Sequence, residues 1–183
     1  NEGRYGSPRI FKTLQKKGYT IGKKRVERLY RELGLVARLI KVTRRAPGSK
    51  RFLASGENLR PEGGVPKNKD KVWVADVTYL KVKGQWQYLS VIMDLYSRRI
   101  VSWSLDKNRT AEVTKRTLQS AIRNRQPDSG LMIHTDRGVE YRGKVYQLEL
   151  KRHGMIHSLN RAGQCTDNAH MESFFHSMKA ELI

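Results

Sequence analysis

The spacing of apolar and polar residues changes at Lys71, and this change separates two kinds of segment. Beyond Lys71, apolar residues alternate with polar ones or form short apolar runs, both of which are typical of strands. Gly84 interrupts the first alternation and predicts a tight turn there. Five strands are predicted in this part of the chain, over residues 72–83, 85–94, 100–105, 131–135 and 155–159.

Helical spacing separates these predicted strands. Helices are predicted over residues 111–124 and 143–153, with Asn108 or Thr110 as the cap of the first, and a last helix begins at Asp167. The resulting order is strand-strand-strand-helix-strand-helix-strand-helix. This order indicates an α/β domain in which a five-stranded mixed sheet is flanked by helices.

Upstream of Lys71, two short segments have the helical period. The first begins at Ser7-Pro8, and the second, over residues 23–33, places Val26, Leu29, Tyr30 and Leu33 on one face before Gly34 ends it. Two short helices around a five-residue break predict a helix-turn-helix-like segment over residues 1–34. Residues 35–70 have little periodicity and contain several Pro and Gly residues, so we interpret them as a basic linker. Residues 71–183 then form the main domain.

The charge of the chain is concentrated at its beginning. The 183 residues include 37 Lys and Arg against 17 Asp and Glu, a formal net charge of +20. Residues 1–51 alone carry 16 of the basic and three of the acidic residues. A basic segment joined to a more balanced domain indicates a nucleic-acid-binding arm. The alternative is a solvated, charged surface with no partner.

Several classes of protein are disfavoured by the sequence. Cys165 is the only cysteine, so neither an internal disulfide nor a thiolate metal cluster is expected, and the protein suits a reducing cytoplasm. No apolar run approaches the length of a membrane span. The sequence does not begin with Met and stops within a helical pattern, so we expect a fragment of a longer protein.

Three acids stand out by their surroundings. Asp76 lies within an apolar strand, Asp136 ends another, and Glu172 lies in the last predicted helix. Burial of a carboxylate costs free energy unless a partner compensates, and Mg²⁺ is a common partner where several acids converge. The alternatives are a buried salt bridge for Asp76, a turn residue for Asp136 and a surface position for Glu172.

Four motifs resemble those of the DDE transposases and retroviral-type integrases. They occur in the order and at the spacing of the second-frame (OrfB) transposases of the insertion-sequence-three family. The motifs begin at Trp73-Val74-Ala75-Asp76, Tyr88-Leu89, His134-Thr135-Asp136-Arg137-Gly138 and Asp167-Asn168-Ala169, the last running through Glu172. The resemblance covers residues from about Arg4 to the end of the chain.

The resemblance implies a ribonuclease-H-like fold and a transposase, with residues 71–183 as an integrase-type catalytic core truncated at its C-terminus. It implies that Asp76, Asp136 and Glu172 hold two Mg²⁺ ions, which Mn²⁺ can replace, for DNA cleavage and strand transfer. Element-end and target DNA are the expected partners. A homo-oligomer on DNA, a first-frame or N-terminal transposase segment and a nucleoid-associated place in the cytoplasm are also expected.

Two groups of residues are candidates for DNA contact. One is basic and lies on the second predicted helix; the other forms a stripe with Glu172 on the last helix. The candidates are Lys23, Lys24, Arg25, Arg28, Arg31, Asn168, His176 and Lys179. An ordinary helical hairpin and an ordinary polar helix face remain the alternatives.

Glu140 departs from the Gln usual at its position in the family motif. It follows Asp136 by four residues and is expected either to add negative charge near the metals or to point into solvent. Trp73, Trp86 and Trp103 are expected to be sheet and core residues. Two other functions stay open: a ribonuclease-H-like nuclease that only hydrolyses, and a catalytically silent DNA-binding remnant of a transposase.

Overall fold

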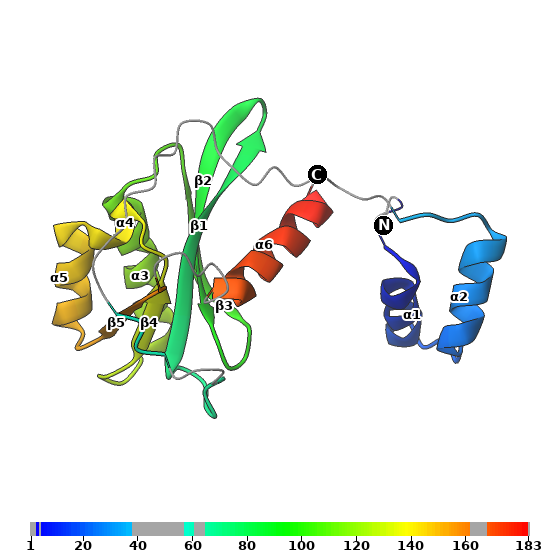
Figure 1. The fold of residues 1–183 in the computed structure, drawn as a ribbon, viewed down its shortest axis with the longest axis horizontal. Coiled ribbons are helices and arrows are strands. Elements are labelled where there is room, and N and C mark those ends of the chain that lie inside the picture. The colour runs from blue at the N-terminus through cyan, green and yellow to red at the C-terminus, as the bar shows by residue number, and fades with distance from the viewer. Residues whose placement is uncertain (1–2, 4, 38–56, 61–64, 162–167, 183) are drawn as a thin grey trace. The chain divides into compact units, whose positions relative to one another are not determined.

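The computed structural model describes residues 3, 5–37, 57–60, 65–161 and 168–182 (Figure 1). The chain divides into two compact units, one of Asn1–Arg44 with His176–Ile183 and one of Arg45–Phe175. Most of the predicted linker, Cys165 and the predicted helix start at Asp167 lie outside the described residues.

A five-stranded mixed sheet forms the centre of the larger unit, in the order β3-β2-β1-β4-β5. β1 pairs antiparallel with β2 and β2 with β3, while β4 runs parallel to β1 and β5 parallel to β4. The strands are β1 Val72–Val82, β2 Gln85–Asp94, β3 Ile100–Asp106, β4 Met132–Thr135 and β5 Ile156–Leu159. The predicted mixed sheet is confirmed.

Among the described residues, helices α3, α4 and α5 lie wholly in the unit of this sheet, and α6 belongs to it as far as Phe175. α3 begins after Thr110, in agreement with the second of its two predicted caps, although the Thr110 side chain makes no capping hydrogen bond. α4 was not predicted, because four residues are too few to show a helical period. The helices are α3 Ala111–Arg125, α4 Val139–Arg142, α5 Lys144–Arg152 and α6 Ala169–Leu182.

Alternate side chains of β1 face opposite sides of the sheet, one towards the hydrophobic core and the other towards the candidate site. Trp73 and Ala75 point into a buried cluster with Leu118 of α3 and Tyr146 of α5. Figure 1 shows α3, α4 and α5 together on this side of the sheet. Because strand side chains alternate between faces, Asp76 belongs to the opposite face and is excluded from this core.

The tryptophans are only partly as expected. Trp73 is fully buried in the core, but Trp86 and Trp103 are 41% and 64% exposed. The core interpretation is therefore wrong for these two residues. Trp86 lies near the tip of the β1–β2 hairpin and Trp103 on the edge strand β3, where only one neighbouring strand covers them.

The smaller unit contains two short helices, α1 Ser7–Lys16 and α2 Lys23–Glu32. The helix α1 begins at Ser7-Pro8, as predicted, with Pro8 in its first turn and Gly6 as the capping residue. The Tyr30 hydroxyl of α2 donates a hydrogen bond to the Tyr5 carbonyl oxygen at 3.0 Å. In the part of the chain that the structure describes, every helix is too short or too polar to cross a membrane.

Candidate active site

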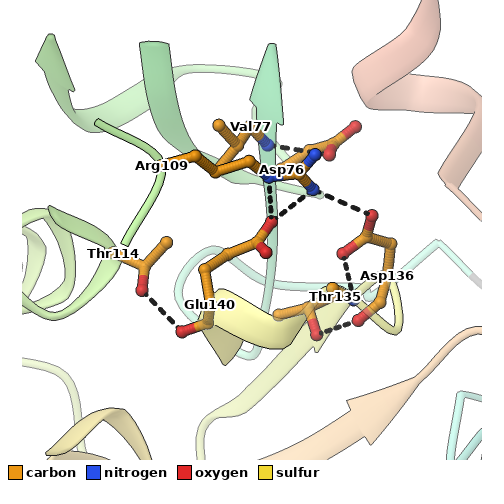
Figure 2. A network of polar contacts seen from close by, with 8 residues as sticks. Asp76, Val77, Arg109, Thr114, Thr135, Asp136 and Glu140 are labelled. Atoms are coloured by element: carbon orange, nitrogen blue, oxygen red, sulfur yellow. Dashed lines mark hydrogen bonds and ion pairs between the residues drawn. The ribbon is translucent and has the colours of Figure 1, made fainter. Parts of the chain in front are cut away.

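Asp76 and Asp136 lie side by side because β1 and β4 are parallel neighbours. The register pairs Ala75 with Thr135, so the next residue on each strand, Asp76 or Asp136, lies at the same level of the sheet. Asp76 Oδ1 accepts a hydrogen bond from the Val77 amide at 2.7 Å, and Asp136 Oδ1 accepts one from the Gly138 amide at 2.9 Å. Both carboxylates are half-buried, and Figure 2 shows how they lie with their neighbours.

Arg109 reaches this pair from the segment between β3 and α3. Its Nε and Nη2 donate hydrogen bonds to Glu140 Oε1 at 2.8 and 2.5 Å. The same Nη2 lies 3.9 Å from Asp136 Oδ2, which makes an ion pair but exceeds hydrogen-bond distance (Figure 2). Arg109 was not predicted as a site residue, because a single Arg in a polar loop gives no signal in the sequence.

Of the two positions expected for Glu140 from the sequence, solvent is wrong: the carboxylate is buried near Asp136 and adds negative charge there. Its side chain is 1% exposed and is paired with Arg109. Its Oε2 atom is buried and has no hydrogen-bond partner among the described residues. Its backbone oxygen accepts a hydrogen bond from Thr114 Oγ1 at 2.9 Å, so the start of α3 holds α4 in place.

Negative charge exceeds positive charge at this site. Burial raises the pKa of Asp76 well above its ordinary value, and repulsion by Asp136 raises it further. Burial, followed by repulsion from Glu140, also raises the pKa of Asp136. Three carboxylates face one guanidinium, a formal charge of −2 when all are ionised. Such a site favours an added cation.

A polar network supports the end of β4 that carries Asp136. Thr135 Oγ1 donates to the Asp136 carbonyl oxygen at 2.8 Å and is 3.0 Å from His157 Nε2. Gln147 Nε2 donates to His157 Nδ1 at 2.9 Å. These contacts require the neutral imidazole with its proton on Nε2. In agreement, burial lowers the pKa of His157 to about 4.

Glu172 is not brought together with the two aspartates. It is exposed on α6, and among the described residues no three His, Cys, Asp or Glu side chains lie close enough to hold one metal ion. After burial, the groups with the largest effects on the pKa of Asp76 are Asp136, the Val77 amide, Arg109 and Glu140. The three-acid site thus stays a prediction.

The other candidates of the last helix differ in exposure. Asn168 is 3% exposed, and its side-chain amide has no hydrogen-bond partner in the described part of the chain. His176 is exposed, whereas Lys179 is 7% exposed. His170, which was not a candidate, contacts Arg98 in the turn after β2.

The basic candidates on α2 all face solvent. Lys23 and Arg28 form ion pairs along the helix with Glu27 at 3.8 Å and Glu32 at 3.5 Å. The exposed basic side chains are those of Lys23, Lys24, Arg25, Arg28 and Arg31. Exposed ion pairs of this kind are weak, so these cations are available to a phosphate backbone.

Comparison with known proteins identifies the family of this fold. The model of the integrase core domain matches residues 66–165, more than half of the chain. The chain belongs to the integrase core domain family. A second model, of an HTH-like domain, matches residues 1–44 ahead of this integrase core.

The chain is also similar to two curated relatives and to one solved structure. The chain is 38% identical over 184 residues to "Transposase InsF for insertion sequence IS3A" of Escherichia coli (strain K12), covering 98% of this chain and 62% of that protein. It is 35% identical to "Insertion element IS600 uncharacterized 31 kDa protein" of Shigella sonnei, covering 98% and 66%. The chain thus spans about three fifths of the length of InsF.

The solved structure is an intasome of simian T-cell lymphotropic virus in complex with the PP2A regulatory subunit B56 gamma. One of its chains superimposes with a TM-score of 0.56 and 19% identity, covering 86% of this chain and 51% of that chain. The predicted ribonuclease-H-like fold of the integrase core is confirmed.

Proposed function

We propose that this protein is a DDE-type DNA transposase, whose core cleaves DNA at the ends of an insertion sequence and joins them to a target. The observation that supports this most is the pair Asp76 and Asp136, held side by side on parallel strands of an integrase core. The similarity to InsF transposases over 98% of the chain agrees with it.

The donor atoms at this site suit a divalent cation. Carboxylate oxygens are the ligands that Mg²⁺ prefers, and Asp76 and Asp136 present theirs in a region where negative charge exceeds positive charge. When bound, two Mg²⁺ ions would activate the attacking water or 3′-hydroxyl and relieve charge on the phosphate oxygens. Asp76 and Asp136 would hold them with Glu172 as the third ligand, and Mn²⁺ is expected to substitute.

The rest of the chain provides DNA contacts in this proposal. The exposed cations of α2 lie in the region matched by the HTH-like model and would contact phosphates of the element end. Asn168, which precedes α6, and His176 and Lys179 on α6 are proposed to contact DNA near Glu172. Assembly as a homo-oligomer on DNA, with a first-frame partner, belongs to the same proposal.

The test uses the full-length protein with labelled element-end DNA and Mg²⁺ or Mn²⁺. We expect 3′-end cleavage and joining of the released 3′-hydroxyl to a second duplex, with both activities lost in Asp136→Asn. Cleavage without joining would indicate a nuclease that only hydrolyses. DNA binding with neither activity would indicate a silent remnant.

A further inference from the structure

The Arg109–Glu140 pair has a geometry that bears directly on cation binding. One guanidinium nitrogen, Nη2, lies between two carboxylates, 2.5 Å from Glu140 and 3.9 Å from Asp136. Arg109 Nε adds a second hydrogen bond to the same Glu140 oxygen at 2.8 Å. The guanidinium is therefore bound to Glu140 and only loosely attracted to Asp136 (Figure 2).

Glu140 itself is held rigidly. Its carboxylate rests against Gly138, where an added Cβ would lie 2.5 Å from Oε1, and its backbone oxygen is bound by Thr114. Its Oε2 is buried without a hydrogen-bond partner in the described residues, so the carboxylate depends on Arg109 for compensation. A buried and fixed carboxylate can anchor a long, flexible Arg side chain, which is 34% exposed here.

Without that anchor, Asp136 is the nearest alternative partner. Arginine favours bidentate, hydrogen-bonded pairs with carboxylates, and a shift of about 1 Å brings Nη2 from 3.9 Å to such a distance from Asp136. A guanidinium bound in this way occupies the oxygens that a cation needs. It also cancels part of the negative charge of the site.

We propose that Glu140 is a positioning residue that holds Arg109 away from Asp136, and so keeps the Asp76–Asp136 pair free to bind a divalent cation. This inference rests on the proposed function, because it takes Asp76 and Asp136 as cation ligands. It assigns Arg109 and Glu140 a role in setting cation affinity rather than in stability alone.

The first test measures Mn²⁺ binding to the full chain by electron paramagnetic resonance, without DNA. Glu140→Gln keeps the size of the side chain but removes its charge, and we expect it to weaken Mn²⁺ binding about tenfold. The double variant Glu140→Gln/Arg109→Gln leaves no unpaired charge and removes the competing guanidinium. Its affinity should return to within about threefold of the parent.

Three results would overturn parts of this reasoning in different ways. If Glu140→Gln binds Mn²⁺ as tightly as the parent, Glu140 has only a structural role and the inference fails. If the double variant is as weak as Glu140→Gln, Arg109 is not the competitor and the inference also fails. If the parent does not bind Mn²⁺, or if Asp136→Asn binds Mn²⁺ as well as the parent does, the proposed function has failed instead.

A crystal structure of Glu140→Gln tests the positioning step independently of affinity and separates it from a simple loss of charge. We expect a guanidinium nitrogen of Arg109 within hydrogen-bond distance of an Asp136 carboxylate oxygen. A guanidinium that stays 3.9 Å away, or turns into solvent, would contradict the anchoring role of Glu140.

Discussion

Gly138→Ala is the most direct test of how the site is held together. The backbone of Gly138 has φ −63° and ψ 145°, which any residue can adopt, so the substitution introduces no conformational strain. Its cost must come from contact. The three atoms nearest to an added Cβ are Oε1, Cδ and Oε2 of Glu140, at 2.5, 2.7 and 2.7 Å.

The size of the effect follows from these distances. Ordinary contact with a Cβ begins at 3.4 Å, so the Glu140 carboxylate must retreat by about 0.9 Å from its 2.5 Å approach. Such a movement disrupts the hydrogen bonds of 2.8 and 2.5 Å from Arg109. Overpacking costs about 1–3 kcal/mol and loss of a charge-assisted hydrogen bond about 1.5–3 kcal/mol. Because the two losses overlap, we expect a decrease of about 2–3 kcal/mol in the free energy of unfolding.

Urea denaturation of the full chain measures this decrease, and Glu140→Ala provides the control background. With the carboxylate absent, the same Gly138→Ala change should cost less than about 0.5 kcal/mol, because its three nearest obstacles are gone. Gly22, which also precedes a helix in an extended conformation and has nothing within 4 Å of an added Cβ, is a matched second site. A cost for Gly138→Ala that is negligible, or equal in both backgrounds, would refute the contact argument.

Three further predictions concern catalysis, pH and DNA. In a cleavage assay, Asp76→Asn, Asp136→Asn and Glu172→Gln should each abolish activity. Urea denaturation without metal should show that each variant is at least as stable as the parent. Near-full activity of any one variant would end the assignment of that residue as a ligand. The pKa of His157 is lowered to about 4, below its ordinary value of 6.5, so its contribution to stability is complete above pH 6.5 and lost as the pH falls toward 4. That loss should reach roughly 2–3 kcal/mol and be absent from His157→Gln, and equal acid sensitivity of both proteins would exclude His157 as its source. Replacing the basic residues of α2 with Gln should make DNA affinity fall less steeply with salt concentration, and an unchanged slope would show that α2 is not the DNA arm. The residues replaced are Lys23, Lys24, Arg25, Arg28 and Arg31.

The sheet and its main helices could be derived from the sequence alone. The alternation across β1 and β2, with the turn at Gly84, marked both strands to within a residue of their observed bounds, because burial of one face of a strand imposes a period of two. The same period assigned Asp76 to the face opposite Trp73. Apolar surroundings, together with the family motifs, also singled out Asp136 before its neighbours were known.

Only the tertiary structure decided what surrounds these acids. Arg109 and Glu140 are 31 residues apart in the sequence, and no local pattern links a loop arginine to a helical glutamate. They meet because α3 and α4 are brought together by packing on the same side of the sheet, where Thr114 binds the backbone of Glu140. Because the Glu140 carboxylate is only 1% exposed, water cannot stabilise its charge, and the ion pair with Arg109 compensates for its burial. The sequence therefore determines which buried positions hold a charged side chain. Which opposite charge pairs with each of them depends on contacts between segments that are distant in the sequence.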